Sequence, residues 1–469
     1  MNLRRIRHDD QGGNRMSART DVTVGAATAP RMAPQLAMPQ LDLPTVAKLM
    51  FPLMLRNVAS DGFVFIDPMD IPGPNNMNPL NPPAFSLPGC IIAAPSFPAD
   101  TPGINQDYVY NWTRDSAIAA IEIAAAKMPT PPGCGVQPLI DYVTFAQTCQ
   151  NNATPTLALA CYTIAGQSRV WREQSDGPAL QTLAMMEAFG QLDPATQAIA
   201  QGVMAQNINY LLGAYQNQTW NLWEEKYGFS FFARSVQLRC FQAVQSNTIG
   251  IAVPPGTGAA ITWLQNALQQ HWNGTIYVSV MPQPTGYDPN SDIIAACIYG
   301  AVPCTDTRLL ATAAQLRSQW TDNTSPAFYP INAADQARGF GPLLGRYPGD
   351  TYDGDTANGY PGGHPWALCS CNLAELYYTL ANQISTNNAV PFDALSAPFF
   401  SQIGVTNATQ PADAVTALQA AGDSVLQAVL YHSDHLELSE QFDGTFGFEK
   451  SVRDLTWSYA AFLSAVRAR

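Results

Sequence analysis

The sequence predicts an all-α fold in which paired helices form a barrel, and three observations lead to this prediction. Apolar residues recur at helical spacing in one segment after another from Val46 to the C-terminus. The Pro-, Gly- and Asn-rich loops between these segments are too long for a simple helix bundle. Alternation typical of strands is confined to the short runs Phe63–Ile66 and Thr275–Met281. About a dozen helices in a chain of this length suit a barrel whose inner loops gather at one end and form a pocket.

Several predicted helices begin at residues that favour a helix N-terminus. Asp176-Gly177-Pro178 places a proline close to the first helical position, and Asp306 or Thr307 can cap the helix that follows. Helices are predicted over residues 46–60 and 138–165, and others are predicted to start near Asp115, Pro178, Pro194, Phe231, Gly258, Asp306, Pro365, Pro411 and Arg453.

The chain divides into two parts by composition. Residues 1–45 are rich in Pro, Ala, Thr and Met without sustained periodicity, so we expect a flexible leader. Residues 46–469 are predicted to form one barrel domain, since large barrels often fold as a single unit.

The charge balance excludes some partners. The net charge is −13, and only 13% of residues are charged, so we expect neither nucleic acid nor an anionic membrane surface as a partner. No apolar run of about 20 residues exists, and no secretory signal is visible. The six Asn-X-Ser/Thr sequons support export only slightly.

Nine cysteines show no double CxxC pattern of a metal site. Cys369 and Cys371 are interpreted as small core residues of a buried helix. Cys297 and Cys304 lie in a polar loop and could pair. The odd total leaves at least one thiol unpaired within the chain.

Trp112-Thr113-Arg114-Asp115 opens a predicted helix after the aromatic residues Tyr108 and Tyr110. Arginine and aspartate can bind vicinal sugar hydroxyls, while aromatic rings stack on the sugar. The alternative is that Asp115 only caps the helix and pairs with Arg114.

Glu224 and Glu225 follow Trp223 in a segment rich in aromatic residues. Like charge and partial burial would raise the pKa of one of the two, as a general acid requires. Exposed acids on a loop are the alternative, which the aromatic neighbours disfavour.

Glu440 is the second candidate carboxylate, and as a general base it would need to stay ionised and hold a water molecule. Hydrolysis of a glycosidic bond by inversion needs such a pair. From spacing alone a surface carboxylate is the more common case, and Glu437 and Asp443 are local competitors.

Two further loops have the same composition. Gly345-Arg346-Tyr347 leads by way of Asp350 and Tyr352 to His364-Pro365-Trp366, and a Ser175-Asp176 segment precedes another helix. Each alone suggests a structural turn. Together these loop-to-helix junctions combine aromatic platforms with planar polar groups, which is typical of carbohydrate sites.

These residues resemble the glucoamylase family, family 15 of the glycoside hydrolases. The motifs that carry the resemblance occur in the family's order over nearly all of residues 46–469. They are YVYNWTRDS at 108–116, SDGPAL at 175–180, NLWEE at 221–225, GRYPGDTY at 345–352, HPWALC at 364–369, and SEQFD with RDLTWSYAA at 439–461.

The resemblance implies an (α/α)6 barrel with a dead-end pocket, making residues 46–469 a catalytic domain that needs no metal or cofactor. It makes Glu224 the general acid and Glu440 the general base of an inverting reaction. Arg114 and Asp115 would bind the terminal glucose, with Arg346 and Glu225 holding it and the next sugar. The implied pocket lining is Tyr108, Trp112, Leu222, Trp223, Trp366 and Trp457, with Ser451 and Tyr352 in supporting positions.

The sequence departs from the family pattern at two places. The family's tryptophan lies six residues before the aspartate of SDGPAL, whereas Trp171 lies five before Asp176 and Val170 takes the expected place. The loop from Asp353 to Gly363 is also longer than in fungal members. We therefore expect outer-subsite stacking, subsite shape and chain-length preference to differ.

The resemblance predicts a glucan 1,4-α-glucosidase that releases β-glucose from the non-reducing ends of starch or maltodextrin, and cleaves α-1,6 links more slowly. The alternatives are a same-fold hydrolase of isomalto-oligosaccharides, dextran or trehalose, and a non-catalytic glucan-binding protein. The Cys297–Cys304 loop resembles a disulfide loop of the family and favours export, and we expect a monomer. Asn111 lies inside a pocket motif, so we do not expect it to be glycosylated.

Overall fold

The computed structural model describes residues 41–66, 85–95, 108–131, 133–169, 171–356 and 359–469, all of which belong to one compact unit. The leader predicted over residues 1–45 therefore lies mostly outside the described residues. Its predicted end falls inside the first helix, which begins at Leu43. The carboxylate of Asp42 caps this helix by accepting from the Thr45 backbone N–H at 3.2 Å.

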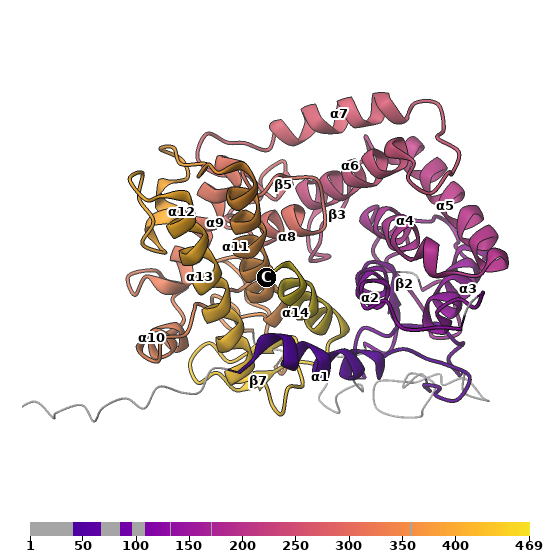
Figure 1. Ribbon diagram of the computed structural model, residues 1–469, viewed down its shortest axis with the longest axis horizontal. Coiled ribbons are helices and arrows are strands. Elements are labelled where there is room, and N and C mark those ends of the chain that lie inside the picture. The colour runs from indigo at the N-terminus through magenta and orange to yellow at the C-terminus, as the bar shows by residue number, and fades with distance from the viewer. Residues whose placement is uncertain (1–40, 67–84, 96–107, 132, 170, 357–358) are drawn as a thin grey trace, which may run out of the picture. The chain divides into compact units, whose positions relative to one another are not determined.

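A closed ring of helices forms the centre of the unit (Figure 1). Each helix of this ring contacts the next, and the last contacts the first. In ring order they are α2 (Thr113–Ala125), α4 (Asp176–Ala188), α6 (Phe231–Ser246), α8 (Asp292–Ile298), α11 (Ala367–Asn387) and α14 (Thr456–Ala468).

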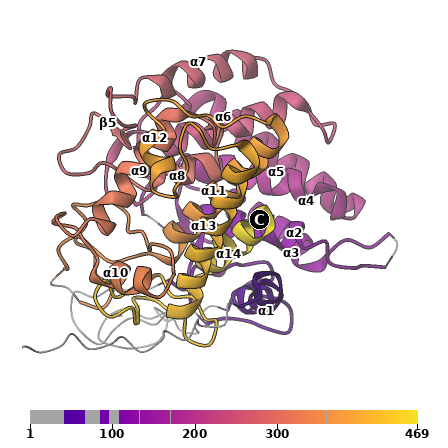
Figure 2. The same cartoon turned by 60° about the vertical axis from the view of Figure 1, so that its left-hand side comes forward.

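A second set of helices packs outside this ring, as seen for α7 over α6 in both views (Figures 1 and 2). Each outer helix contacts one inner helix. The outer helices are α1 (Leu43–Leu55) on α14, α3 (Gln137–Asn151) on α2, α5 (Pro194–Ala214) on α4, α7 (Thr257–Gln269) on α6, α9 (Thr307–Thr321) on α8 and α13 (Pro411–His432) on α11. Within the residues that the structure describes, six inner and six outer helices make the predicted (α/α)6 barrel, which is confirmed.

The two layers differ in what they bury. Inner helix α2 buries nearly every residue on all its faces, including Ala117, Ala119 and Ala120, whose small side chains allow neighbouring helices to approach closely. Outer helix α7 buries only one stripe, with Ala260 and Leu264 on it, and leaves the opposite face to solvent.

Short elements fill the connections. The short helices are η2 (Phe189–Gln191), α10 (Pro330–Ala337) and α12 (Ala397–Ser401). The strands pair antiparallel and are β1 (Asn111–Trp112) with β2 (Cys161–Tyr162), β3 (Thr219–Trp220) with β4 (Tyr227–Ser230), β4 with β5 (Val280–Met281), and β6 (Gln441–Phe442) with β7 (Glu449–Lys450). No helix of the described chain combines the length and apolar character needed to cross a membrane.

The structure corrects several predicted elements. The helix predicted over residues 138–165 ends at Asn151, ahead of Pro155. The run Thr275–Met281 is a strand only at its end, because earlier backbone N–H groups bond elsewhere: that of Tyr277 reaches the Thr312 hydroxyl and that of Ser279 reaches Asp288. The run Phe63–Ile66 forms isolated bridges and no strand.

The inner helices place the site. Residues just before their N-termini, or in their first turn, come together at one end of the ring. Arg114 stands in the first turn of α2, Trp366 directly precedes α11, and Trp457 stands in the first turn of α14. The partial positive charge of several helix N-termini is therefore directed to the end of the barrel that carries these side chains.

The contact between α11 and α13 predicts opposite effects of two glycine substitutions. A Cβ added at Gly422 would lie 2.5 Å from a ring carbon of Tyr378, which is buried and held by its hydrogen bond to Asp423. We expect Gly422→Ala to lower the free energy of unfolding by about 1–3 kcal/mol. Gly202 of α5 has open space around it, so Gly202→Ala should raise that free energy by about 0.5–1 kcal/mol. Calorimetric melting of both variants checks the two signs, and a stabilised Gly422→Ala would contradict the close approach.

Candidate functional site

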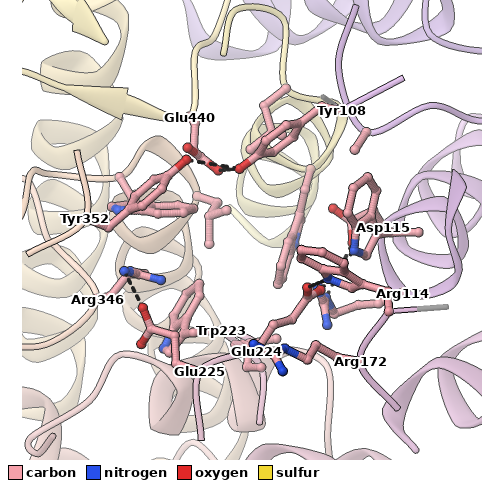
Figure 3. Close-up of a pocket in the computed structure, with 18 of the residues that line it drawn as sticks. Tyr108, Arg114, Asp115, Arg172, Trp223, Glu224, Glu225, Arg346, Tyr352 and Glu440 are labelled. Atoms are coloured by element: carbon pink, nitrogen blue, oxygen red, sulfur yellow. Dashed lines mark hydrogen bonds and ion pairs between the residues drawn. The ribbon is translucent and has the colours of Figure 1, made fainter. Parts of the chain in front are cut away.

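A pocket of about 330 Å³ opens where the N-terminal ends of the inner helices meet (Figure 3). All residues predicted to act on or bind substrate line it together. They are Tyr108, Trp112, Arg114, Asp115, Leu222, Trp223, Glu224, Glu225, Arg346, Tyr352, Trp366, Glu440 and Trp457. Their assembly from segments far apart in the chain supports one site, while their individual roles stay predictions.

Glu224 stands on a tight turn between β3 and β4. Its backbone lies in the left-handed region, with φ of 61°, which costs a non-glycine residue about 1–3 kcal/mol. Asn221 holds the turn: its side-chain oxygen accepts from the backbone N–H groups of Glu225 (3.1 Å) and Lys226 (3.0 Å). The Asn221 amide also donates to the Tyr287 hydroxyl at 2.7 Å. The turn thus directs both adjacent carboxylates to the pocket.

Three N–H donors surround the Glu224 carboxylate. Trp112 Nε1 donates to one oxygen at 2.9 Å, and Arg114 lies 3.4 Å from the same oxygen. Trp171 Nε1 donates to the other oxygen. These partners orient the carboxyl group and stabilise the anion that it becomes after giving up a proton.

Arg114 is buried, and its guanidinium lies close to several polar side chains. Its guanidinium donates to Gln174 at 2.9 Å and to Asp176 at 3.3 Å, and lies 3.4 Å from Asp115. Burial raises the pKa of Asp115 to about 6, and nearby Glu224 adds to this rise while Arg114 opposes it. The alternative that Asp115 merely caps its helix does not account for its place on the pocket wall.

Glu440 directly precedes β6 and lies across the pocket from Glu224 (Figure 3). Tyr108 donates its hydroxyl to one carboxylate oxygen at 2.9 Å, and Ser451 donates to the other. Burial raises the pKa of Glu440 above its usual value, and the hydrogen bonds from Ser451 and Tyr108 oppose that rise. Tyr352 joins the group through a hydroxyl contact of 3.2 Å with Tyr108.

The long loop that begins at Asp353 holds the Glu440 hairpin in place. Lys450 of β7 forms ion pairs with Asp353 (3.3 Å) and Asp355 (3.2 Å). Asp355 also accepts from the backbone N–H of Ser451 at 3.0 Å. The loop that departs from the family pattern therefore contacts the residue that donates to Glu440.

Arg346 is the second buried arginine of the pocket. Two of its nitrogens bind Asp350 at 2.8 and 2.7 Å, and Nη2 lies 2.9 Å from Glu225. Glu225 also accepts from the Tyr347 hydroxyl at 2.7 Å and from that of Tyr287 at 3.1 Å. Glu225 is thus fixed by three donors at the side of the pocket opposite Arg114.

Aromatic rings form the walls between the charged groups. The Trp223 and Trp366 rings lie 5.6 Å apart, and Tyr352 lies 5.9 Å from Trp366. Trp457 donates its indole N–H to Tyr299 at 3.0 Å and lies beneath Arg114, 5.2 Å from its guanidinium carbon. Such rings can stack on the apolar faces of sugars.

The competing carboxylates lie elsewhere. Glu437 is exposed and pairs with Arg56 at 3.1 Å. Asp443 accepts from the backbone N–H groups of Thr445 and Phe446, both at 2.8 Å, and so caps the turn between β6 and β7. Neither lines the pocket. In the described part of the chain no group of three or more His, Cys, Asp or Glu residues is placed to hold a metal ion.

Cys297 and Cys304 are free thiols in the structure, and their possible pairing in a disulfide stays a prediction. Helix α8 runs through Cys297, so this residue belongs to a packed helix and not to the polar loop assumed from the sequence. Burial raises the pKa of both thiols, that of Cys304 to about 11. Cys369 and Cys371 are buried in α11, as predicted.

Sequence reasoning missed several residues of the pocket. Trp171 reaches Glu224 despite its shifted place in the chain, while Val170 lies outside the described residues. Arg169 and Arg172 line the pocket beside Trp171. The remaining additions are the apolar residues Ala93, Leu368 and Leu455. The close spacing of two arginines and a tryptophan over residues 169–172 was the one signal in the sequence that could have indicated this part of the pocket lining.

Comparison with known proteins finds similar chains over most of the sequence. Residues 83–467 match the family described as glycosyl hydrolases family 15. Glucoamylase P of Amorphotheca resinae is 30% identical over 84% of this chain and 67% of that protein. Glucoamylase 1 of Rhizopus oryzae is 27% identical over 83% of this chain and 68% of that protein. A solved glucoamylase of Hormoconis resinae superposes with a TM-score of 0.73 and 26% identity, covering 91% of this chain and 73% of that chain.

The contact between Ser451 and Glu440 predicts a change in pH dependence. Ser451→Ala removes a donor to the Glu440 carboxylate, so the pKa of Glu440 should rise further. If Glu440 must be ionised to act, the acidic limb of the kcat/KM profile moves to higher pH by about one pH unit. Ser464→Ala is the matched control, because Ser464 donates to the buried Glu375 outside the pocket. An acidic limb that stays in place in a folded Ser451→Ala variant would contradict the assignment.

Proposed function

The chain belongs to family 15 of the glycosyl hydrolases, and from this premise we propose that it is a glucan 1,4-α-glucosidase that removes single glucose units from the non-reducing ends of α-glucans. The protein is a glycoside hydrolase, so we discard the alternative of a non-catalytic glucan-binding protein. The observation that carries the proposal is the placement of Glu224 and Glu440 on opposite sides of one pocket (Figure 3).

Glu224 acts as the general acid in this proposal. It gives its proton to the oxygen that links the terminal glucose to the next sugar, and the bond between that oxygen and the anomeric carbon breaks. The N–H groups of Trp112, Trp171 and Arg114 then stabilise the carboxylate that remains.

Glu440 acts as the general base from the other side. It takes a proton from a water molecule while the water oxygen bonds to the anomeric carbon on the face opposite the leaving sugar. The configuration is therefore inverted, and the product is β-glucose. Ser451 and Tyr108 orient the carboxylate for this step through hydrogen bonds. Exchange with solvent returns the proton to Glu224 and removes that on Glu440.

The remaining polar groups bind the sugar. In this proposal Arg114 and Asp115 bind the terminal glucose hydroxyls, and Arg346 and Glu225 bind that glucose and its neighbour. All four residues line the pocket. Carboxylates around the ring favour the positive charge that develops at the anomeric carbon in the transition state. The family resemblance implies a dead-end pocket, so we expect action from chain ends and not internal cleavage.

We propose that the protein is exported, and this proposal does not depend on the possible disulfide. Four sequon asparagines, Asn217, Asn273, Asn323 and Asn407, are exposed and open to glycosylation. Asn111 is buried and donates to the Ile91 carbonyl at 2.9 Å, so it should carry no glycan. Peptide mapping of the secreted protein tests both points. We also propose a monomer, because one chain supplies the whole described lining of the pocket.

The proposed substrate class predicts an order of rates. Glucose release should be fastest from maltotetraose, slower from isomaltotetraose and negligible from trehalose. Faster release from isomaltotetraose or trehalose would assign the protein to the same-fold alternatives.

The proposed roles predict separable defects in the two carboxylate variants. Glu224→Gln and Glu440→Gln should each lower kcat on maltotetraose by about 10²–10⁴-fold. On α-glucosyl fluoride, whose leaving group needs little protonation, Glu224→Gln should recover much of its activity and Glu440→Gln should not. Glu437→Gln serves as the control, since this glutamate is exposed outside the pocket. Recovery by Glu440→Gln in place of Glu224→Gln would reverse the assignment.

A further inference from the structure

Two arginines stand at the more exposed wall of the pocket, on either side of Trp171. The guanidinium carbon of Arg169 lies 4.0 Å from the ring centroid of Tyr110 and 4.9 Å from that of Trp171. That of Arg172 lies 3.9 Å from the ring centroid of Trp220 and 5.9 Å from that of Trp171. Guanidinium groups and aromatic rings thus alternate in this group, which we call the arginine wall (Tyr110, Arg169, Trp171, Arg172 and Trp220). Of its five residues, Arg169, Trp171 and Arg172 line the pocket.

The arginines of the wall differ from the two deeper ones. Arg114 and Arg346 are buried and paired with carboxylates. Within the residues that the structure describes, Arg169 and Arg172 form no ion pair and their side chains donate no hydrogen bond; their contacts are with ring faces. Stacking occupies the flat face of a guanidinium group and leaves the N–H donors along its edge free. Two sets of such donors are therefore available to a ligand.

The position of the wall indicates which part of a substrate it would meet. Trp171 donates to Glu224, and Figure 3 shows Arg172 on the Glu224 side of the pocket, away from Glu440. If Glu224 protonates the leaving oxygen, the wall contacts sugars beyond the cleaved bond and not the terminal glucose. Trp171 is 43% exposed, which agrees with a place towards the opening.

Charge indicates the chemistry of the ligand. Asp115, Glu224, Glu225 and Glu440 line the same pocket, and the chain carries a net charge of −13, so an anionic substrate would otherwise be repelled. Unpaired guanidinium edges bind carboxylate and phosphate oxygens in pairs. We propose that the arginine wall is a subsite for an oxyanion, a carboxylate or a phosphate monoester, carried by the sugar on the leaving side of the cleaved bond. This inference rests on the proposed glucosidase function.

A matched pair of disaccharides tests the proposal. Maltobionate and maltitol both carry an α-1,4-linked glucose on an open-chain leaving group, but only maltobionate bears a carboxylate. The quantity to compare is the ratio of kcat/KM for maltobionate to that for maltitol, measured above about pH 5, where the carboxylate is ionised. The ratio cancels effects on the catalytic groups that both substrates share.

Removing the wall's charge should reduce this ratio selectively. We expect the ratio to fall by roughly tenfold in the double variant Arg169→Gln/Arg172→Gln, which is the effect of losing about one hydrogen bond to a charged group. The fall should be smaller in each single variant. Added salt should lower the ratio in the unmutated protein and not in the double variant. Inorganic phosphate should inhibit turnover of maltobionate more than turnover of maltitol. This test asks whether free phosphate occupies the same site as an oxyanion carried by the substrate. Arg338→Gln is the matched control, because Arg338 also lies over a ring, that of Tyr431, outside the pocket.

The results that would contradict the oxyanion subsite differ from those that would contradict the proposed glucosidase function. An unchanged ratio in the double variant, or equal losses on both substrates, would overturn the oxyanion subsite and leave a role in binding neutral sugar hydroxyls. An equal fall of the ratio in Arg338→Gln would overturn it as well, because the effect would then be general to surface charge. No hydrolysis of maltitol or maltotetraose by the unmutated protein would instead refute the glucosidase function itself.

Discussion

Two buried guanidinium groups, Arg114 and Arg346, connect the loops that form the pocket. A buried charge must be paired, and removal of one partner typically costs about 3–5 kcal/mol. Arg114 joins the start of α2 to Asp176 at the start of α4 and to Glu224 on the turn before α6. Arg346, from the loop before α11, joins Glu225 on that same turn. The need to pair these two charges therefore fixes the adjacent glutamates in space, and the site's geometry follows from it.

The two carboxylates proposed to act in catalysis have different surroundings. N–H donors surround Glu224, among them a cationic guanidinium and the indole of Trp171. Hydroxyl donors, from Ser451 and Tyr108, hold Glu440 where burial raises its pKa. A group that must deliver a proton to the leaving oxygen and one that must bind water need different neighbours. Tyr108, which donates to Glu440, and Trp112 and Arg114, which donate to Glu224, belong to one segment at the start of α2, so this segment contacts both carboxylates.

The barrel and most of the pocket could be predicted from sequence because their signals are local. Helical periodicity marks long helices, and carboxylates such as Glu224 and Glu440 stand among aromatic residues in recognisable motifs. The failures concern contacts that depend on packing. Helix α8 is short and buried throughout its first turns, so it shows no periodic polar face, and the residues around Cys297 were taken as a loop. Trp171 lies one residue away from the position of the family's tryptophan, so its contact with Glu224 became visible only in the folded chain.

The central claim is that Glu224 and Glu440 act from opposite sides of the bond to invert the anomeric carbon. Proton NMR of the anomeric signals during the first minutes of maltotetraose digestion tests this most directly, because newly released glucose has not yet mutarotated. The account predicts that β-glucose appears first. Early α-glucose would mean retention of configuration and would contradict the assignment of Glu440 as a base acting through water.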